Sequence, residues 1–249
     1  QLSLHYHQNF YLTYNNLGMA LIHKGLPEKA LPYLQQALRL NPHFAPAYTN
    51  QLFCMLYIPN LSPMAIFAAF QQWGQKIQQS ISPLPRNLPV KRSSRLRIGY
   101  ISPDFREHAT QYVIEGILSE HHHDLFDIFC YAEVSQPDEV TKHFQSYVKH
   151  WCFTSGFSDL EVAQRIQKDK IDILVELCAG PTFNNRLNVF ALKPAPVQVS
   201  LYALSVGLTT FDYRIVDSLL LTEETRKLNI EKVFDLPSCF IVFKPIKPA

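Results

Sequence analysis

Apolar residues recur at steps of three and four through the first part of the chain, which is the period of helices that bury one face. In residues 11–44 this pattern forms two stretches, separated by Gly25-Leu26-Pro27 and ended by Asn41-Pro42. Gly18 and Ala30 fall where two antiparallel helices would come closest, so a larger side chain there would push the helices apart. These residues predict one helix–turn–helix unit of the kind that stacks in helical arrays.

A second, looser pair of helices is expected to follow. Residues 44–57 have a helical period, and Ser62-Pro63 supplies a capping residue and a first-turn proline for a helix over 65–77. About three such units are usually needed to bury all the apolar faces. The aromatic residues of this pair are expected in the core, with a peptide-binding surface as the alternative: Phe53, Tyr57, Phe67, Phe70 and Trp73.

Residues 79–94 hold three prolines and no helical period, so a linker is predicted between a helical repeat region over 1–78 and a second region over 95–249. In the second region strands and helices alternate. Strands are predicted at 96–101, 126–131, 171–177, 197–202, 212–217 and 232–236, with helices near 110–120, 137–149, 159–169 and 186–191. Alternation with short loops favours parallel pairing and right-handed crossovers, hence one Rossmann-like lobe covered on both faces.

Composition restricts the expected partners. The net charge is +2, from 23 basic and 21 acidic residues, which does not favour nucleic acid; the basic cluster at 91–97 is expected to be a solvated linker, with a phosphate contact as the alternative. Five widely spaced cysteines without a Cys-x-x-Cys pair predict reduced thiols and a cytoplasmic protein. There is no leader pattern and no run of about 18 apolar residues, so no membrane contact is expected.

His108 is the first candidate for chemistry. The first predicted strand is stopped by Ser102-Pro103-Asp104, and His108 lies on the loop that follows. Ligands of open α/β sheets bind beyond the carboxyl ends of the strands. A helix beginning near Thr110 would favour anions and disfavour a protonated imidazole, and a neutral imidazole is a competent general base. The alternative is a loop histidine without a role; Asp104 and Glu107 could orient it or cap the helix.

The loop after the predicted strand at 171–177 is the second candidate. Gly180 allows a close backbone approach to a ligand, and this loop offers three hydrogen-bond donors: Thr182, Asn184 and Arg186. The alternative is a plain turn that caps the following helix.

Familiar motifs add little. The sequence has neither a Gly-x-Gly-x-x-Gly fingerprint nor a phosphate-binding Gly-x-x-x-x-Gly-Lys loop. His121-His122-His123 resembles a metal-binding tract, but consecutive histidines point in different directions, so metal ligation is not expected.

The unit at 11–44 resembles a tetratricopeptide repeat, with Leu-Gly, Gly-x-x-x-x-Ala and Ala-x-x-x-x-Pro spacings. The chain as a whole, from about Tyr11 to Pro245, resembles the O-linked N-acetylglucosamine transferase family in its bacterial, repeat-bearing form. The matching segments are 96–105 with His108, 126–131, 171–177, Asn185-Arg186-Leu187, 193–199, and Asp212-Tyr213 with Asp217.

The resemblance implies a fold of the GT-B type, in which repeats present a polypeptide acceptor and UDP-N-acetylglucosamine binds between two Rossmann-like lobes. A Ser or Thr hydroxyl would attack the anomeric carbon with inversion, without a metal cofactor. On this basis His108 is the expected base or substrate contact, and Thr182, Asn185 and Arg186 are the expected substrate-binding residues.

Three departures qualify the expected activity. Bacterial relatives have a histidine where this chain has Pro181, and the segment 201–206 lacks the family's Trp-Leu-Gly-Tyr-Pro sequence. The second lobe, which holds most uridine diphosphate contacts in the family, has no counterpart in the 249 residues. We therefore expect a diverged or truncated member with little transfer activity alone. The alternatives are a non-catalytic protein-interaction module and an unrelated Rossmann-like binder of a small anion.

Overall fold

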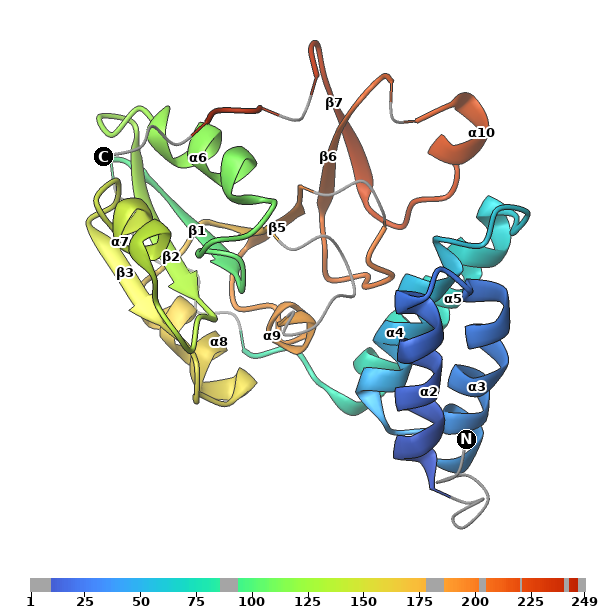
Figure 1. The fold of residues 1–249 in the computed structure, drawn as a ribbon. Coiled ribbons are helices and arrows are strands. Elements are labelled where there is room, and N and C mark those ends of the chain that lie inside the picture. Colours follow the sequence, from blue (N-terminus) through green and yellow to red (C-terminus); the bar gives the residue numbers. More distant parts are fainter. Residues whose placement is uncertain are drawn as a thin grey trace. The chain divides into compact units, whose positions relative to one another are not determined.

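The computed structural model describes residues 10–85, 94–177, 186–201, 205–219, 221–239 and 242–245. The chain separates into two compact units, one running to Trp73 and the other beginning at Gly74 (Figure 1). The first unit is helical and the second is built on a parallel sheet. This agrees with the predicted fold class, a short helical repeat region followed by a Rossmann-like lobe.

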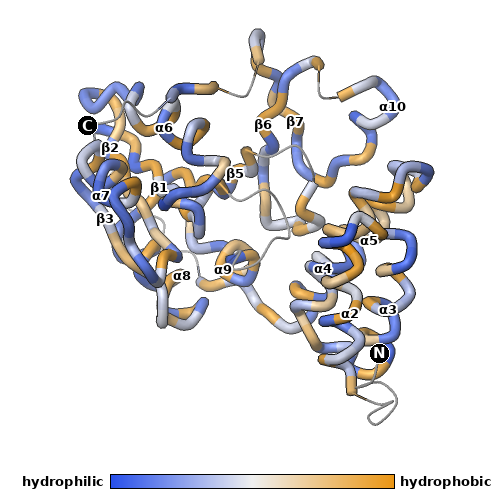
Figure 2. Tube along the Cα trace, viewed as in Figure 1, coloured by the Kyte–Doolittle hydropathy of each residue, from blue (hydrophilic) through white to orange (hydrophobic). Residues whose placement is uncertain are grey.

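Within the described residues the repeat region has four helices: α2 (Tyr11–His23), α3 (Pro27–Leu40), α4 (Ala45–Met55) and α5 (Pro63–Ser80). Hydrophobic and hydrophilic residues alternate in short patches along α2 and α3 (Figure 2). A methyl group added at Gly18 would lie 2.6 Å from the Leu34 side chain, and Ala30 is fully buried. The predicted close approach of these two helices at Gly18 and Ala30 is therefore confirmed, because neither position has room for a larger side chain.

The aromatic residues predicted in this core differ in burial, and two of them, Phe53 and Phe67, are half-buried. Phe70 and Trp73 are buried, and the Trp73 ring stacks on Tyr48 with the ring centroids 4.6 Å apart. Tyr57 is 57% exposed, so its assignment to the core was wrong. It lies beyond the last residue of α4 and packs edge-on against Phe53 at 4.9 Å. The helical period of the sequence therefore extends to Tyr57, although the helix itself ends at Met55.

The second unit has a seven-stranded sheet in which every pairing is parallel, with the strand order β3-β2-β1-β4-β5-β6-β7. The strands are β1 (Leu96–Ser102), β2 (Phe126–Ala132), β3 (His150–Phe153), β4 (Ile173–Glu176), β5 (Val197–Ser200), β6 (Tyr213–Asp217) and β7 (Lys232–Leu236). The helices are α6 (Gln111–Ser119), α7 (Glu139–Gln145), α8 (Asp159–Lys168), α9 (Leu187–Ala191) and α10 (Glu223–Arg226).

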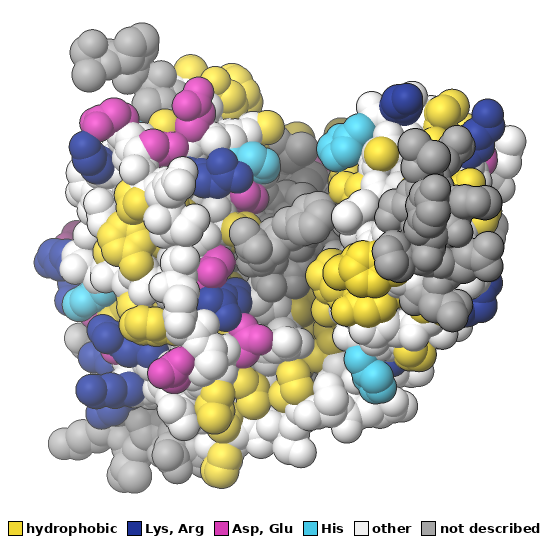
Figure 3. Space-filling view, turned by 60° about the horizontal axis from the view of Figure 1, so that its bottom comes forward, with side chains coloured by type: hydrophobic (Ala, Val, Ile, Leu, Met, Phe, Trp, Pro, Cys, Tyr) yellow, Lys and Arg dark blue, Asp and Glu magenta, His cyan; other side chains and the backbone are white. Residues whose placement is uncertain are grey.

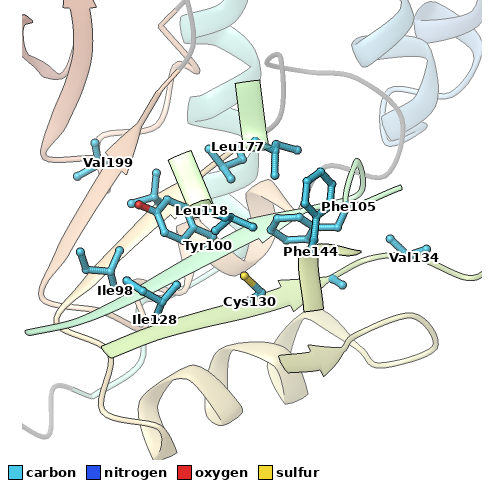
Figure 4. Packing of buried hydrophobic residues seen from close by; sticks show 13 residues of the cluster. Ile98, Tyr100, Phe105, Leu118, Ile128, Cys130, Val134, Phe144, Leu177 and Val199 are labelled. Carbon is cyan, nitrogen blue, oxygen red and sulfur yellow. The ribbon is translucent and has the colours of Figure 1, made fainter. Parts of the chain in front are cut away.

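Helices cover both faces of this sheet. On one face Ile98, Tyr100 and Cys130 pack with Leu118 of α6 and Phe144 of α7 (Figure 4). On the other face the Tyr131 hydroxyl donates to Asp169, the residue that follows α8, at 2.9 Å. Successive residues of a strand point to opposite faces, so Cys130 and Tyr131 separate the two layers. The predicted two-sided covering is thereby confirmed.

The structure adds one strand to the prediction. A helix was expected over 137–149, but α7 ends at Gln145, and His150–Phe153 pairs with β2 as the edge strand β3. This strand is four residues long, too short for its period to be distinguished from the end of a helix. The missing strand changes the strand order but not the fold class.

The end of α5 belongs to the second unit. Gln78 and Thr209 exchange two hydrogen bonds, of 2.6 and 3.2 Å, and the Leu84 amide donates to the Leu192 carbonyl at 2.7 Å. The predicted linker over 79–94 begins within this region and stays a prediction, because residues 86–93 are outside the described part of the chain.

Candidate functional site

The strand order reverses between β1 and β4. β1 leads outward to β2 and β3 on one side, and β4 leads to β5, β6 and β7 on the other. At such a switch point the loops that leave two adjacent strands turn in opposite directions and open a crevice at the carboxyl edge. The loop after β1 carries His108. The loop after β4 carries the other predicted residues; of these Thr182 and Asn185 fall outside the described residues, and Arg186 is described.

His108 is half-exposed and belongs to a small polar group. Its Nδ1 atom lies 2.9 Å from the Thr110 hydroxyl oxygen and 3.7 Å from Oδ1 of Asp104. The Asp104 carboxyl is largely buried, and burial raises its pKa, while nearby His108, Arg106 and the Thr110 hydroxyl partly offset that rise. The Thr110 amide also donates to Nδ1 at 3.4 Å, which requires an unprotonated Nδ1; in the other tautomer the proton on Nδ1 is donated to the Thr110 hydroxyl and Nε2 is the proton acceptor.

The backbone that carries this group is fixed at its start. The Ser102 carbonyl accepts a hydrogen bond from the Glu133 amide at 3.0 Å, and the Ser102 hydroxyl accepts one from the Asp104 amide at 3.0 Å. Phe105 is completely buried, and its ring meets Phe144 edge-on with the centroids 6.2 Å apart (Figure 4). The loop is thus attached both to the next strand and to the hydrophobic core.

Arg186 has a set of contacts within the protein. Its Nε and Nη2 atoms donate to Glu133 at 2.9 and 2.6 Å, and Nη1 donates to Asp159 at 2.7 Å. Nη2 also lies 3.0 Å from the carbonyl oxygens of Thr154 and Phe157. Burial alone would lower the pKa of Arg186, but the two carboxylates outweigh it and raise the pKa. The guanidinium therefore ties three loops of the carboxyl edge together, those that follow β2, β3 and β4. Its predicted contact with substrate stays a prediction.

A buried polar row, which sequence reasoning missed, lies on the neighbouring strands. Glu176, Ser200 and Arg214 are adjacent in register across β4, β5 and β6, and each is at most 2% exposed. The Ser200 hydroxyl donates to Glu176 at 3.2 Å. Burial lowers the pKa of Arg214 to about 10, against the opposing effect of Glu231. Charged residues inside otherwise apolar strands were the available clue, because such residues are rarely buried without partners.

The histidine tract is not a metal site in the part of the chain that the structure describes, where no group of three metal-binding side chains occurs. His121 turns inward, and its Nε2 atom lies 2.8 Å from the Tyr100 hydroxyl, while His122 and His123 are exposed. Burial, with smaller effects of His123 and His122, lowers the pKa of His121 to about 4.

This shift predicts acid destabilisation. Between about pH 6.5 and pH 4 the unfolded chain binds a proton at this histidine and the folded chain does not, so stability falls as the pH falls through that range. Since the ring is partly solvated, we expect a loss of roughly 1–2 kcal/mol. Urea unfolding at pH 7 and pH 4.5 measures it, and His121→Gln should remove this component. Equal pH dependence in both proteins would contradict the assignment.

The helical repeat unit and the doubly wound parallel sheet are those of a Rossmann-like lobe joined to tetratricopeptide-type helices. The chain belongs to glycosyl transferase family 41, whose model matches residues 77–244, and a tetratricopeptide repeat model matches residues 11–44. The family suggested by the sequence is thereby confirmed.

Individual relatives agree with this placement. The probable UDP-N-acetylglucosamine–peptide N-acetylglucosaminyltransferase SPINDLY of Arabidopsis thaliana is 35% identical over 214 residues, which cover 83% of this chain and 23% of that protein. The corresponding probable transferase SEC of the same plant is 35% identical over 164 residues, which cover 64% and 17%. A mutant of the Thermobaculum terrenum O-GlcNAc transferase has a similar solved structure, with a TM-score of 0.88 and 26% identity.

This chain spans a minor part of the proteins it resembles. The sequence alignment covers 23% of SPINDLY. The structural alignment covers 46% of the solved bacterial chain and 96% of this chain. None of the helices in the described ranges is long and apolar enough to cross a membrane.

Proposed function

We propose that this chain is the repeat-bearing half of a transferase that moves N-acetylglucosamine from UDP-N-acetylglucosamine to Ser or Thr hydroxyls of proteins. The observation that carries the proposal is the family match over 77–244, within which His108 lies beyond β1 at the switch point of the sheet. The matched relatives carry names with this donor and a peptide acceptor. Contacts to the donor beyond those of this lobe would come from residues outside this chain.

His108 is the proposed base. As the acceptor oxygen forms its bond to the anomeric carbon, the bond from that carbon to the UDP oxygen breaks, and UDP leaves with the electron pair. The hydroxyl proton passes to Nε2 of His108. In the tautomer with the proton on Nδ1, donated to the Thr110 hydroxyl, Nε2 is available for this role. Direct displacement in this way inverts the configuration at the sugar and needs no metal ion.

The proposed partners follow from the two units. The repeats would hold the polypeptide acceptor, since helical repeat arrays commonly bind extended peptides on their surfaces. Nucleic acid is not among the proposed partners, because basic and acidic side chains occur together on the face of the α/β unit in Figure 3 and the net charge is +2. We place the protein in the cytoplasm; the cysteines within the described residues are free thiols.

A non-catalytic interaction module is the second candidate. The feature in its favour is Pro181, which stands where the resemblance drawn from the sequence implies a histidine. A proline ring can neither donate nor accept a hydrogen bond through its side chain, so a polar contact in that loop is lost.

Binding of UDP tests the proposal on this chain. We expect weak binding by calorimetry, with a dissociation constant of about 1 mM, because one lobe supplies only part of the contacts. His108→Ala should weaken the binding, and His122→Ala, at an exposed histidine, should leave it unchanged. UDP binding that His108→Ala does not alter would refute the role of His108. No binding of UDP or UDP-N-acetylglucosamine by the folded chain would favour the interaction module.

A further inference from the structure

We infer that Asp138, the residue that precedes α7, is a positioning residue for His108. This inference rests on the proposed function, because Asp138 matters for catalysis only if His108, the residue that it positions, is the base. Asp138 is 30 positions from His108 in the sequence, and the two residues belong to different loops of the carboxyl edge.

The carboxylate of Asp138 makes two kinds of contact at once. Its Oδ2 atom accepts a hydrogen bond of 2.7 Å from the backbone amide of Glu107, the residue immediately before His108. Its Oδ1 atom accepts 2.8 and 3.0 Å hydrogen bonds from the amide and hydroxyl of Thr141, and so caps α7. One side chain therefore joins the start of α7 to the backbone of the His108 loop.

The charge state of Asp138 suits this role. Partial burial by itself would raise the pKa of this carboxyl, but the backbone amides of Glu107 and Thr141 outweigh it and hold the pKa below its usual value. Asp138 is consequently an anion at neutral pH, and a hydrogen bond from an amide to a carboxylate is shorter and stronger than one to a neutral acceptor.

The helix that presents Asp138 is itself firmly placed. Glu115 of α6 is 3% exposed, and it accepts hydrogen bonds from the Tyr147 hydroxyl at 2.6 Å and from Nε2 of His143 at 2.9 Å. On the side of the loop, Phe105 packs against Phe144 of α7. Since α7 is tied to α6 near its end and to the loop by Phe144, the contact from Asp138 to Glu107 attaches the loop to a firmly placed helix immediately before His108.

The protein offers a matched control for this contact. Ser158 caps α8 with the same reciprocal arrangement, accepting from the Glu161 amide at 3.3 Å while its own amide donates to the Glu161 carboxylate at 2.7 Å. No described hydrogen bond joins the Ser158 side chain to the His108 loop. Loss of the Ser158 cap therefore reports the cost of losing a helix cap without any effect on that loop.

Asp138→Ser separates the two roles of Asp138. Serine is a good capping residue, so α7 keeps its cap, but a single hydroxyl oxygen cannot also reach the Glu107 amide. The readouts are hydrogen exchange of the Glu107 amide and the ring resonances of His108 by NMR, compared with the urea midpoint. We expect at least tenfold faster exchange at Glu107 and displaced His108 resonances, with a nearly unchanged midpoint. Ser158→Ala should lower the midpoint and leave both NMR signals as in the parent chain.

Unchanged exchange at Glu107 and unchanged His108 resonances in Asp138→Ser would overturn the inference, as would equal changes in Ser158→Ala. These readouts do not depend on sugar transfer. The positioning role can therefore hold even if His108 proves not to be a base, and it can fail while His108→Ala still abolishes UDP binding.

Discussion

Arg186→Ala is expected to lower the free energy of unfolding of the α/β unit by about 3–5 kcal/mol, the usual cost of removing one partner from a buried ion pair. The side chains of Arg186 and Glu133 are each 14% exposed, so the substitution leaves the Glu133 carboxylate in a largely dry place without its cation. It also removes the donor shared by the Thr154 and Phe157 carbonyls. Urea unfolding followed by tryptophan fluorescence measures the loss.

Arg165→Ala is the control. Arg165 also pairs with a carboxylate, Asp169, at 2.9 Å, but its side chain is 50% exposed. Exposed pairs contribute little, so this substitution should cost less than about 1 kcal/mol. If Arg186→Ala unfolded at the same urea concentration as the parent chain and lost UDP binding instead, Arg186 would be a substrate contact and the structural role would be wrong.

Gly74→Ala is expected to cost roughly 3 kcal/mol, although alanine favours helices over glycine by about 1 kcal/mol. A methyl group at Gly74 would lie 1.7 Å from the carbonyl oxygen of Gly207, and backbone cannot move aside as a side chain can. The 205–210 loop would have to shift, which breaks the paired hydrogen bonds between Gln78 and Thr209. The melting temperature should fall by about 6–12 °C.

Gly116→Ala provides the comparison, because Gly116 is also a helical glycine of the α/β unit. There the new methyl group would lie 2.6 Å from a terminal carbon of Val242, which can turn away, and 3.1 Å from the Val242 carbonyl oxygen, much farther than the 1.7 Å to backbone at Gly74. We expect a change of less than about 1 kcal/mol, since the gain in helix preference offsets the contact. Equal costs for the two substitutions would show that α5 does not meet the 205–210 loop as described.

Strands with a clear pattern and a clear stop were predictable. The apolar run from Leu96 ends at Ser102-Pro103-Asp104, and β1 occupies 96–102. The strand predicted at 232–236 is β7 with the same bounds. In both cases local residue preferences and tertiary pairing favour the same conformation. The short edge strand β3 could not be predicted, because its four residues form a strand only through their pairing with β2.

The site was predictable in position and less so in detail. That His108 would lie beyond a strand end followed from the stop after β1. The pairing of Arg186 with Glu133 and Asp159 could not be predicted, because these partners are 53 and 27 positions away in the sequence. A sequence shows that an arginine can donate hydrogen bonds, whereas only the packing of distant loops decides which acceptors it meets.

Contacts at the carboxyl edge of the sheet hold the His108 loop at both its ends. Arg186 holds Glu133, whose amide holds Ser102 at the start of the His108 loop, and Asp138 holds the end of the same loop. The residue proposed for chemistry is half-exposed, while the residues that place it are paired and mostly buried. Such rigid support is what a proton acceptor needs, because proton transfer depends on distance and direction.

A chimera tests the central claim most directly, which is that His108 acts as the base of a family 41 site. Residues 10–245 would replace the matching half of the Thermobaculum terrenum O-GlcNAc transferase, and transfer of labelled N-acetylglucosamine to Ser and Thr peptides would be measured. We predict transfer by the folded chimera and a rate at least about 100-fold lower with His108→Ala. A folded chimera that transfers no sugar, or one whose rate is the same with His108→Ala, would contradict the account.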